Sequence, residues 1–274
     1  TPIKSIKIEK VGASFSLNKL LINNIPTLKS VTISPNLGNE LHLDLANNLN
    51  LEEILFLRDD FNSSPRQKIG FLNLEGNNNL KRIIGLNMTD VDLSNFGLIN
   101  LEELDLSMYN RYKYYSSSGF IVFGDTKSIN LKGLPKLKKL IAHNQSFDSI
   151  DLSDIPLLEE IDLTNTINLE SLDLSNFNHL KNVKINLIYN SISSLGMYSP
   201  KLRNLKINNN SSLEKVTIEN LSTILEHFEL NNNENIADIS FLKSSIFGSD
   251  NYLNKNTTFL IANNTKLNAI NLNQ

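Results

Sequence analysis

The sequence lacks cysteine altogether and contains only 11 glycines in 274 residues. Without cysteine, the chain cannot form a disulfide bond, a cysteine-ligated zinc site or a cysteine nucleophile. The scarcity of glycine leaves little material for a phosphate-binding loop, and neither the GxxxxGKS/T pattern nor the GxSxG pattern occurs. Cysteine-dependent chemistry is therefore excluded, and the sequence shows no sign of a P-loop enzyme or a serine hydrolase.

The chain also lacks a basic excess and a long apolar run. Its formal net charge is -3 and its isoelectric point is about 5.8, whereas nucleic-acid-binding proteins usually carry a basic patch. No apolar run approaches the roughly 18 residues that a membrane-spanning helix needs. We therefore expect no nucleic-acid partner and no membrane span in this chain.

The sequence is instead dominated by a hydrophobic hexad of the form L-x-x-L-x-L, which returns about every eleven residues. Its clearest run is LEEIDL (158–163), LESLDL (169–174) and LKNVKI (180–185), and a further unit begins at Phe147. The unit that begins at Leu80 is imperfect, because Gly85 occupies its sixth position. A hexad cannot bury its own apolar face, so the units must stack on one another. We therefore predict a single solenoid domain over residues 1–274.

The spacing within each unit is that of a β-strand. In the unit that begins at Leu169, Leu172 and Leu174 are expected to point inward and Asp173 outward. Eleven residues allow one short strand and one turn, with no room for a ten-residue helix. Two units would form one coil with a strand on each side, and parallel strands would stack from coil to coil. Roughly eleven coils at about 4.8 Å each predict a rod on the order of 50 Å long.

Asparagine is over-used, at 43 residues, and much of it lies in the predicted turns. The runs 208–210, 231–233 and 263–264 all follow strand-like segments. Asparagine suits turns because its side chain bonds nearby backbone groups and tolerates the left-handed conformation. If the runs stack in register, their amides are expected to bond one another and the free backbone groups of the turns.

The segments LEELDLSMYN, LEEIDLTNTINLESLDLSNFNHL and LRNLKINNN resemble leucine-rich repeats of an irregular bacterial variety with 21–23 residues and two LxxLxL halves. The resemblance covers nearly the whole chain and implies a leucine-rich-repeat solenoid that is mainly β, with few or no long helices. An α/β leucine-rich-repeat horseshoe remains the alternative. The resemblance further implies adhesion to, or recognition of, a protein or glycan by a secreted or cell-surface bacterial protein.

Three inserts interrupt the repeat, near residues 58–68, 108–125 and 243–256. Loops on a rigid scaffold commonly carry function, and exposed tyrosine and arginine are typical of contact surfaces. The second insert is the richest in such residues, and the alternative for it is an ordinary extra hairpin whose strand is FIVF (120–123). The candidate partner-binding residues are Tyr109, Arg111, Tyr112, Lys113, Tyr114 and Tyr115.

Two sets of residues are candidates for catalytic or metal-binding groups. The four histidines, at positions 42, 143, 179 and 227, show no HExxH pattern or other familiar metal spacing. An aspartate column falls on the outward fifth position of the unit, where paired carboxylates could hydrolyse glycosides or bind calcium. We interpret this column as a solvent-facing consensus choice, and we predict no catalytic residue, metal or cofactor. The column contains Asp92, Asp105, Asp151, Asp162 and Asp173.

Three functions remain open from the sequence. The favoured hypothesis is a non-enzymatic recognition module that binds a protein or glycan through exposed strand faces and the tyrosine-rich insert. The alternatives are a structural spacer in a surface protein and, less favoured, a carbohydrate-active β-helix enzyme.

Overall fold

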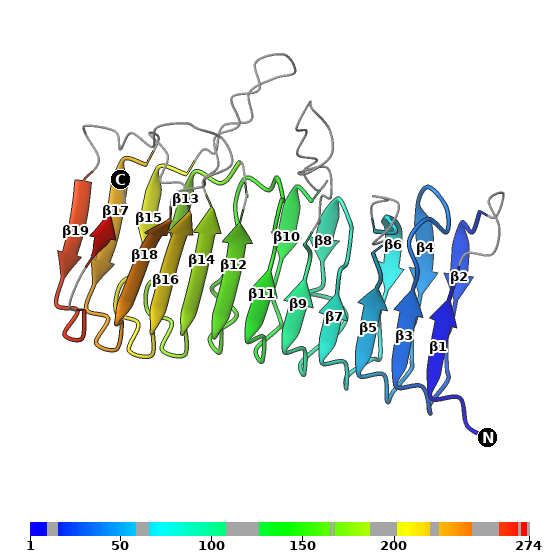
Figure 1. Cartoon of the computed structure of the whole chain (residues 1–274). Helices are drawn as coiled ribbons and strands as arrows, with labels where there is room; N and C mark the ends of the chain where they lie inside the picture. Colours follow the sequence, from blue (N-terminus) through cyan, green and yellow to red (C-terminus); the bar gives the residue numbers. More distant parts are fainter. Residues whose placement is uncertain are drawn as a thin grey trace, which may run out of the picture.

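The computed structural model describes residues 1–9, 16–58, 66–107, 126–164, 166, 168–186, 202–219, 225–242, 258–267 and 270–272. Within these residues the chain forms 20 strands and no helix. Every strand pairs in parallel with a strand of a neighbouring coil, which gives a solenoid-like stack (Figure 1). The α/β horseshoe alternative is therefore wrong for the described part of the chain.

One side of the stack is a continuous sheet, here called the large sheet. Its strands follow in the order β1 (Ser5–Ile8), β3 (Ser30–Ile33), β5 (Glu53–Phe56), β7 (Arg82–Ile84), β9 (Glu103–Asp105), β11 (Lys139–Ile141), β12 (Glu160–Thr164), β14 (Asn182–Asn186), β16 (Lys215–Glu219), β18 (Asp238–Leu242) and β20 (Asn271–Leu272). These eleven strands agree with the roughly eleven coils predicted from the repeat.

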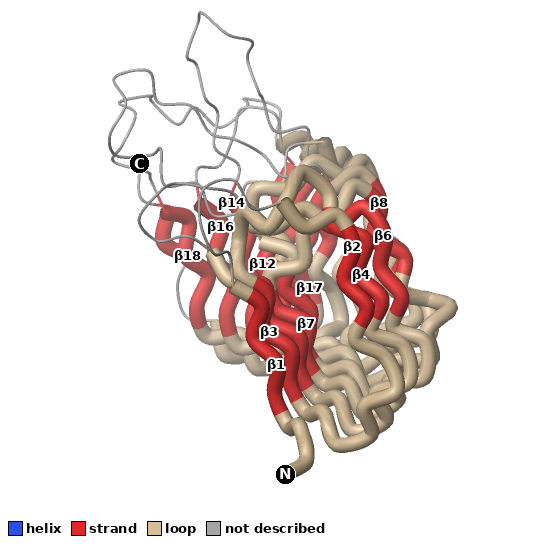
Figure 2. Tube along the Cα trace, turned by 90° about the vertical axis from the view of Figure 1, so that its right-hand side faces the viewer, coloured by secondary structure: helices blue, strands red, loops and turns tan. Residues whose placement is uncertain are grey.

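The other side, here called the return side, contains three shorter sheets. They are β2 (Lys19–Leu21), β4 (Leu41–Asp44) and β6 (Ile69–Asn73); β8 (Asp90–Asp92) and β10 (Ser128–Asn130); and β13 (Ser171–Asp173), β15 (Asn204–Lys206), β17 (His227–Asn231) and β19 (Thr258–Ala262). Viewed along the stack, the two sides of each coil enclose a narrow interior (Figure 2). The predicted coil with a strand on each side is confirmed for most of the chain.

A single apolar core fills this interior, because alternate strand residues point inward. Leu172 and Leu174 are buried while Asp173 between them is exposed, as the hexad predicts. In the large sheet, Ile161 pairs with Val183 and Val183 with Val216, so equivalent apolar side chains stack from coil to coil. No coil can bury its face without its neighbours, which makes the stack continuous.

Asparagines form two columns along the turns that follow the return strands, which confirms the predicted stacking. In the outer column Asn176, Asn209, Asn232 and Asn263 all have a left-handed backbone, with φ between 54° and 67°. Each of the last three donates its side-chain amide to the side-chain oxygen of the asparagine one coil before it, over 2.9–3.2 Å. The ladder links the turns of successive coils through side-chain hydrogen bonds at the surface.

The inner asparagine column is buried and bonds to the backbone. The side-chain oxygen of Asn233 accepts the backbone N–H of Asn210 over 3.0 Å, and its Nδ2 donates to the carbonyl of Ile207 over 2.8 Å. Asn210 and Asn233 have no exposed surface. Asn48 and Asn77 repeat this arrangement in the early coils. The asparagine richness of the chain is therefore largely structural.

The two corners of the coil differ in the length of their connections. Those that lead from the return strands back to the large sheet contain six to ten residues: 22–29, 45–52, 74–81, 93–102, 131–138, 174–181, 207–214, 232–237 and 263–270. The connections that lead from the large sheet to a return strand contain five to 22 residues: 9–18, 34–40, 57–68, 85–89, 106–127, 165–170, 187–203, 220–226 and 243–257. Because the strands are parallel, all of the second set begin at one edge, uppermost in Figure 1. We call this edge the carboxyl edge.

No helix among the described residues is long and apolar enough to cross a membrane.

Candidate functional site

The predicted partner-binding residues Tyr109, Arg111, Tyr112, Lys113, Tyr114 and Tyr115 lie outside the described residues. The structure does show where their insert joins the scaffold. Ser107, which precedes it, and Thr126, which follows it, have no exposed surface. Ser107 follows β9 at the carboxyl edge, and Thr126 donates its hydroxyl to the carbonyl of Met88 over 2.8 Å. The insert therefore starts and ends at fixed points of the coil stack.

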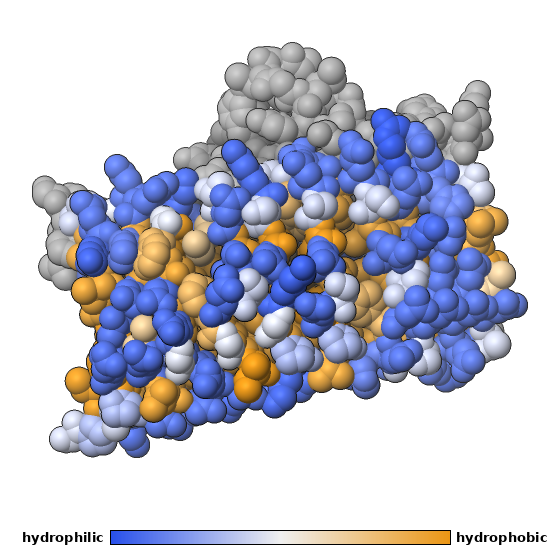
Figure 3. All heavy atoms as spheres, turned by 180° about the vertical axis from the view of Figure 1, so that it is seen from behind, coloured by the Kyte–Doolittle hydropathy of each residue, from blue (hydrophilic) through white to orange (hydrophobic). Residues whose placement is uncertain are grey.

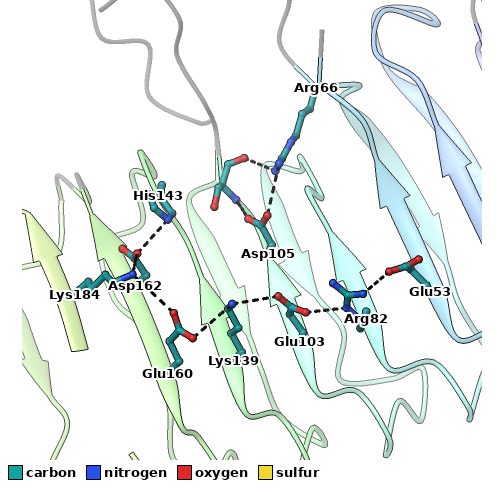
Figure 4. Close-up of polar contacts among 11 residues, drawn as sticks. Glu53, Arg66, Arg82, Glu103, Asp105, Lys139, His143, Glu160, Asp162 and Lys184 are labelled. Carbon is teal, nitrogen blue, oxygen red and sulfur yellow. Dashed lines mark hydrogen bonds and ion pairs between the residues drawn. The ribbon is translucent and has the colours of Figure 1, made fainter. Parts of the chain in front are cut away.

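The outward face of the large sheet carries rows of charged side chains whose sign alternates from coil to coil (Figure 4). In one row Arg82 lies between Glu53 and Glu103, at 2.8 Å from each, and Lys139 lies between Glu103 and Glu160, at 3.6 and 3.5 Å. The preceding position forms a parallel row in which Glu52 lies between Lys29 and Lys81. Hydrogen bonds from these two lysines lower the pKa of Glu52. The charges of this face are therefore largely paired with one another.

Sequence reasoning missed these rows, although the signal is visible. Successive large-sheet units read LEE (51–53), LKR (80–82), LEE (101–103), LKK (137–139) and LEE (158–160). Each coil offers two charges of one sign, and the next coil offers the opposite sign. In a parallel sheet the equivalent residues of neighbouring coils are direct neighbours, so alternation avoids like-charge contacts.

Replacing Glu103 with Lys should lower the free energy of unfolding by about 1 to 2 kcal/mol, because an ammonium group would then lie between Arg82 and Lys139. Glu103→Gln, which removes the ion pairs without adding repulsion, should cost less than about 1 kcal/mol. Urea denaturation at low and at high salt measures both values, and the difference between the variants should shrink at high salt. Equal stability of the two variants would contradict the alternating arrangement.

A second polar group is centred on Asp162 in the middle of β12, on the same face. Asp162 is buried, with 6% of its side chain exposed, and its Oδ2 lies 3.3 Å from His143 Nε2 and 3.7 Å from Lys184 Nζ (Figure 4). Its Oδ1 accepts the hydroxyl and the amide of Thr164 over 2.6 and 3.1 Å. Burial by itself raises the pKa of Asp162, but the hydrogen bonds from His143 and Thr164 outweigh it and hold the pKa below its ordinary value. The carboxylate is therefore ionised and engaged on both oxygens.

Arg66, near the end of the first predicted insert, is buried among the described residues. Only 7% of the Arg66 side chain is exposed; its Nη1 donates to the carbonyl of Ser107 over 2.6 Å, and its Nη2 lies 3.6 Å from Asp105 Oδ2. The guanidinium lies against Gly85, where a Cβ would come within 2.6 Å of the guanidinium carbon. The imperfect unit at Leu80 is thereby explained, because glycine makes room for this side chain.

The aspartate column is not the row of solvent-facing side chains that the sequence suggested. Asp105 and Asp162 are buried on the large sheet, whereas Asp92, Asp151 and Asp173 lie on the return side and are exposed. What the five share is a turn, since the Oδ1 of each accepts the backbone N–H two residues later. At Asp92, Asp105 and Asp173, each the last residue of its strand, this Asx turn starts the corner that follows. The repeated aspartate therefore has a structural role in every one of these coils.

Three of the four histidines contact a neighbouring aromatic or acidic side chain, and the fourth is exposed. His42 stacks on Phe71, with ring centroids 4.2 Å apart, and His227 bonds the carboxylate of Glu229. His143 contacts Asp162, and His179 is exposed. Among the described residues, no group of three or more histidine and acidic side chains is placed to hold a metal ion.

The return side contains a groove of about 660 Å³ between two successive coils. One wall is the segment 150–153 with the turn at 156–157, and the other is β13 with the turn at 175–179. Asp151 and Asp173 lie on opposite walls, and Phe177 adds an aromatic surface. Seen from behind, this side of the molecule is mostly hydrophilic, with apolar side chains between the polar ones (Figure 3). The sequence predicts a strand in the unit that begins at Phe147. This prediction was wrong, because no strand lies between β11 and β12, a segment that the structure describes throughout.

The described geometry defines a solenoid-like protein built from parallel β-strands. No model of a known protein family matches the sequence. A comparison with curated proteins also found no match. What the chain does must therefore be inferred from its own surfaces.

Proposed function

We propose that the chain is a non-enzymatic recognition module that binds a protein or glycan partner at the carboxyl edge. The observation that carries this proposal is that the longest connections between strands all lie at that edge. The opposite corner keeps connections of six to ten residues, while those at the carboxyl edge reach 22 residues in 106–127. A rigid stack with its long insertions at one edge is the arrangement expected of a scaffold that presents binding loops.

The outward face beside the carboxyl edge supports the same proposal. Leu55, Ile84 and Ile141 point outward in β5, β7 and β11 and are partly exposed. Leu55 and Ile84 are direct register partners, so their side chains form one apolar surface. Large apolar side chains on an outward strand face, beside loops that contain tyrosine and arginine, are typical of protein and glycan contact surfaces.

The carboxylates at the carboxyl edge are not arranged for hydrolysis. Glycoside hydrolysis needs two carboxyl groups across one substrate-binding cleft. Asp105 and Asp162 at the carboxyl edge are buried and occupied, by Arg66 and by His143 and Thr164. We further propose that the repeat is an irregular leucine-rich repeat and that the protein is secreted or displayed on a bacterial surface, where such modules adhere to other cells.

The proposal is tested by screening the chain against an array of purified extracellular proteins and glycans. Replacement of Tyr112, Tyr114 and Tyr115 with Ala should weaken the binding of the identified ligand at least about tenfold, because these side chains supply contact area. The melting temperature should change by less than about 2 °C, because these three residues belong to an insert and not to the repeat units that form the core. Unchanged binding by this triple variant would contradict the proposal.

The matched control is Ile99→Ala together with Lys136→Ala. Both residues are exposed on connections of the opposite corner, and ligand affinity should stay within about twofold. Turnover of a polysaccharide in a hydrolase panel would contradict the non-enzymatic part of the proposal. Failure to bind any array member, with no turnover, would favour a structural spacer.

A further inference from the structure

The hydrogen-bond ladder of the return side is interrupted at the groove. The pair β8–β10 and the sheet that begins with β13 are separate, and segment 148–153 occupies the coil between them. No backbone hydrogen bond links this segment to β10 or to β13, all of which the structure describes. Strand β13 therefore has a free edge toward the groove, although its other edge pairs with β15.

The free edge presents backbone donors and acceptors in strand geometry. The N–H of Leu174 donates to Lys206 and the carbonyl of Glu170 accepts from Asn204, both on the β15 side. Because alternate residues of a strand face alternate neighbours, the backbone groups of Ser171 and Asp173 face the groove. A row of unpaired N–H and C=O groups along a strand is a template for an added strand.

The groove also carries negative charge that the described chain does not neutralise by ion pairing. Asp151 and Asp173 form no ion pair within the described residues, in contrast to the paired carboxylates of the large sheet. Hydrogen bonds from the hydroxyl and amide of Ser153, with a smaller contribution from Lys132, lower the pKa of Asp151. Phe177 and Ile150 line the groove while packing against the core, which offers apolar surface to an aliphatic chain. Lysine and arginine combine an aliphatic stem with a positive head group.

We propose that this groove binds an extended peptide segment rich in lysine or arginine, added as a strand along the free edge of β13. The backbone of the peptide pairs with Ser171 and Asp173, and its cationic side chains reach Asp151 and Asp173. An oligosaccharide could use the same hydroxyl, carboxylate and amide groups, but its hydroxyls do not repeat at the spacing of a strand backbone, and a neutral sugar forms no ion pair with Asp151 and Asp173. The peptide is therefore the occupant that both features favour.

The test uses the whole chain and three synthetic probes in isothermal titration calorimetry: acetyl-KTKTKT-amide, acetyl-ETETET-amide and acetyl-KPKPKP-amide. The first probe should bind with a dissociation constant below about 1 mM. The acidic probe should bind at least about tenfold more weakly because its charge is wrong, and the proline probe at least about tenfold more weakly because proline cannot donate to a strand edge. Cellohexaose and chitohexaose serve as the glycan probes.

The matched variants are Asp151→Asn with Asp173→Asn, compared with Asp92→Asn. Asparagine keeps the oxygen that accepts the turn amide but removes the charge. The double variant should lose at least about tenfold in affinity for the lysine probe, while Asp92→Asn should stay within about twofold because Asp92 forms the same turn outside the groove. No binding of the lysine probe at about 5 mM, equal binding of the proline probe, or binding of the oligosaccharides alone would overturn the proposal. The tyrosine variants of the carboxyl edge should leave peptide affinity unchanged, so the two proposals are tested separately.

Discussion

Replacing Asn233 with Leu is expected to lower the free energy of unfolding by about 3 to 5 kcal/mol, although the two side chains are similar in size. The asparagine is fully buried, and its side chain satisfies the backbone N–H of Asn210 and the carbonyl of Ile207. Leucine would leave both groups buried without partners, and each such group costs about 1 to 3 kcal/mol. Urea denaturation followed by circular dichroism measures the loss.

Asn235→Ala is the control for this experiment. Asn235 lies two residues further along the same turn, is exposed, donates a hydrogen bond to the carbonyl of Ser211 and accepts one from Lys266 Nζ. Its replacement should cost about 1 kcal/mol or less, because water can satisfy the groups left behind. If Asn233→Leu were as mild as Asn235→Ala, the buried asparagine column would not contribute to stability as described.

Replacing Arg66 with Ala should lower the free energy of unfolding by a similar amount, about 3 to 5 kcal/mol. The variant removes the guanidinium that contacts Asp105 and the carbonyl of Ser107, and it leaves a buried carboxylate without its cation. It also opens a cavity above Gly85, which has no side chain to fill the space. Thermal and urea denaturation of the variant check the expected loss.

The double variant Arg66→Met with Asp105→Asn separates charge from packing. With Asp105→Asn, the side-chain oxygen can still accept the backbone N–H of Ser107. Methionine would fill much of the volume above Gly85. Because no buried charge remains unpaired, the double variant should be at least about 1 kcal/mol more stable than Arg66→Ala. A double variant that is no more stable than Arg66→Ala would contradict the assignment of a buried ion pair.

The strands could be predicted from the sequence because the hexad is a local signal. Leu172 and Leu174 point inward for the reason that alternate residues of a strand share a face, and this rule needs only adjacent positions. The asparagine columns were predictable for the same reason, since the runs at 208–210, 231–233 and 263–264 recur at one place in successive coils. The glycine-poor turns then use asparagine for the left-handed position.

Features that depend on contacts between coils were harder to predict. The burial of Asp105 follows from Arg66, which lies outside the repeat unit of Asp105 and reaches it only after the chain has stacked. The sequence IDLS at 150–153 resembles the strand-forming units, yet in the described structure it forms no strand and pairs with neither β10 nor β13. The groove and its free strand edge are therefore consequences of stacking, and no local pattern predicts them. The tyrosine-rich site remains a prediction.

The stacking of coils is tested most directly by a cysteine pair, since the chain has no cysteine of its own. Thr217 and Ser240 are register partners in β16 and β18, and neighbouring strands bring Cα atoms within the range of a disulfide. Thr217→Cys with Ser240→Cys should form an intramolecular disulfide in the native protein, whereas Thr217→Cys with Lys206→Cys, on opposite sides of the stack, should not. Absence of the first disulfide in the folded protein, or equal formation of both, would contradict a chain wound coil on coil.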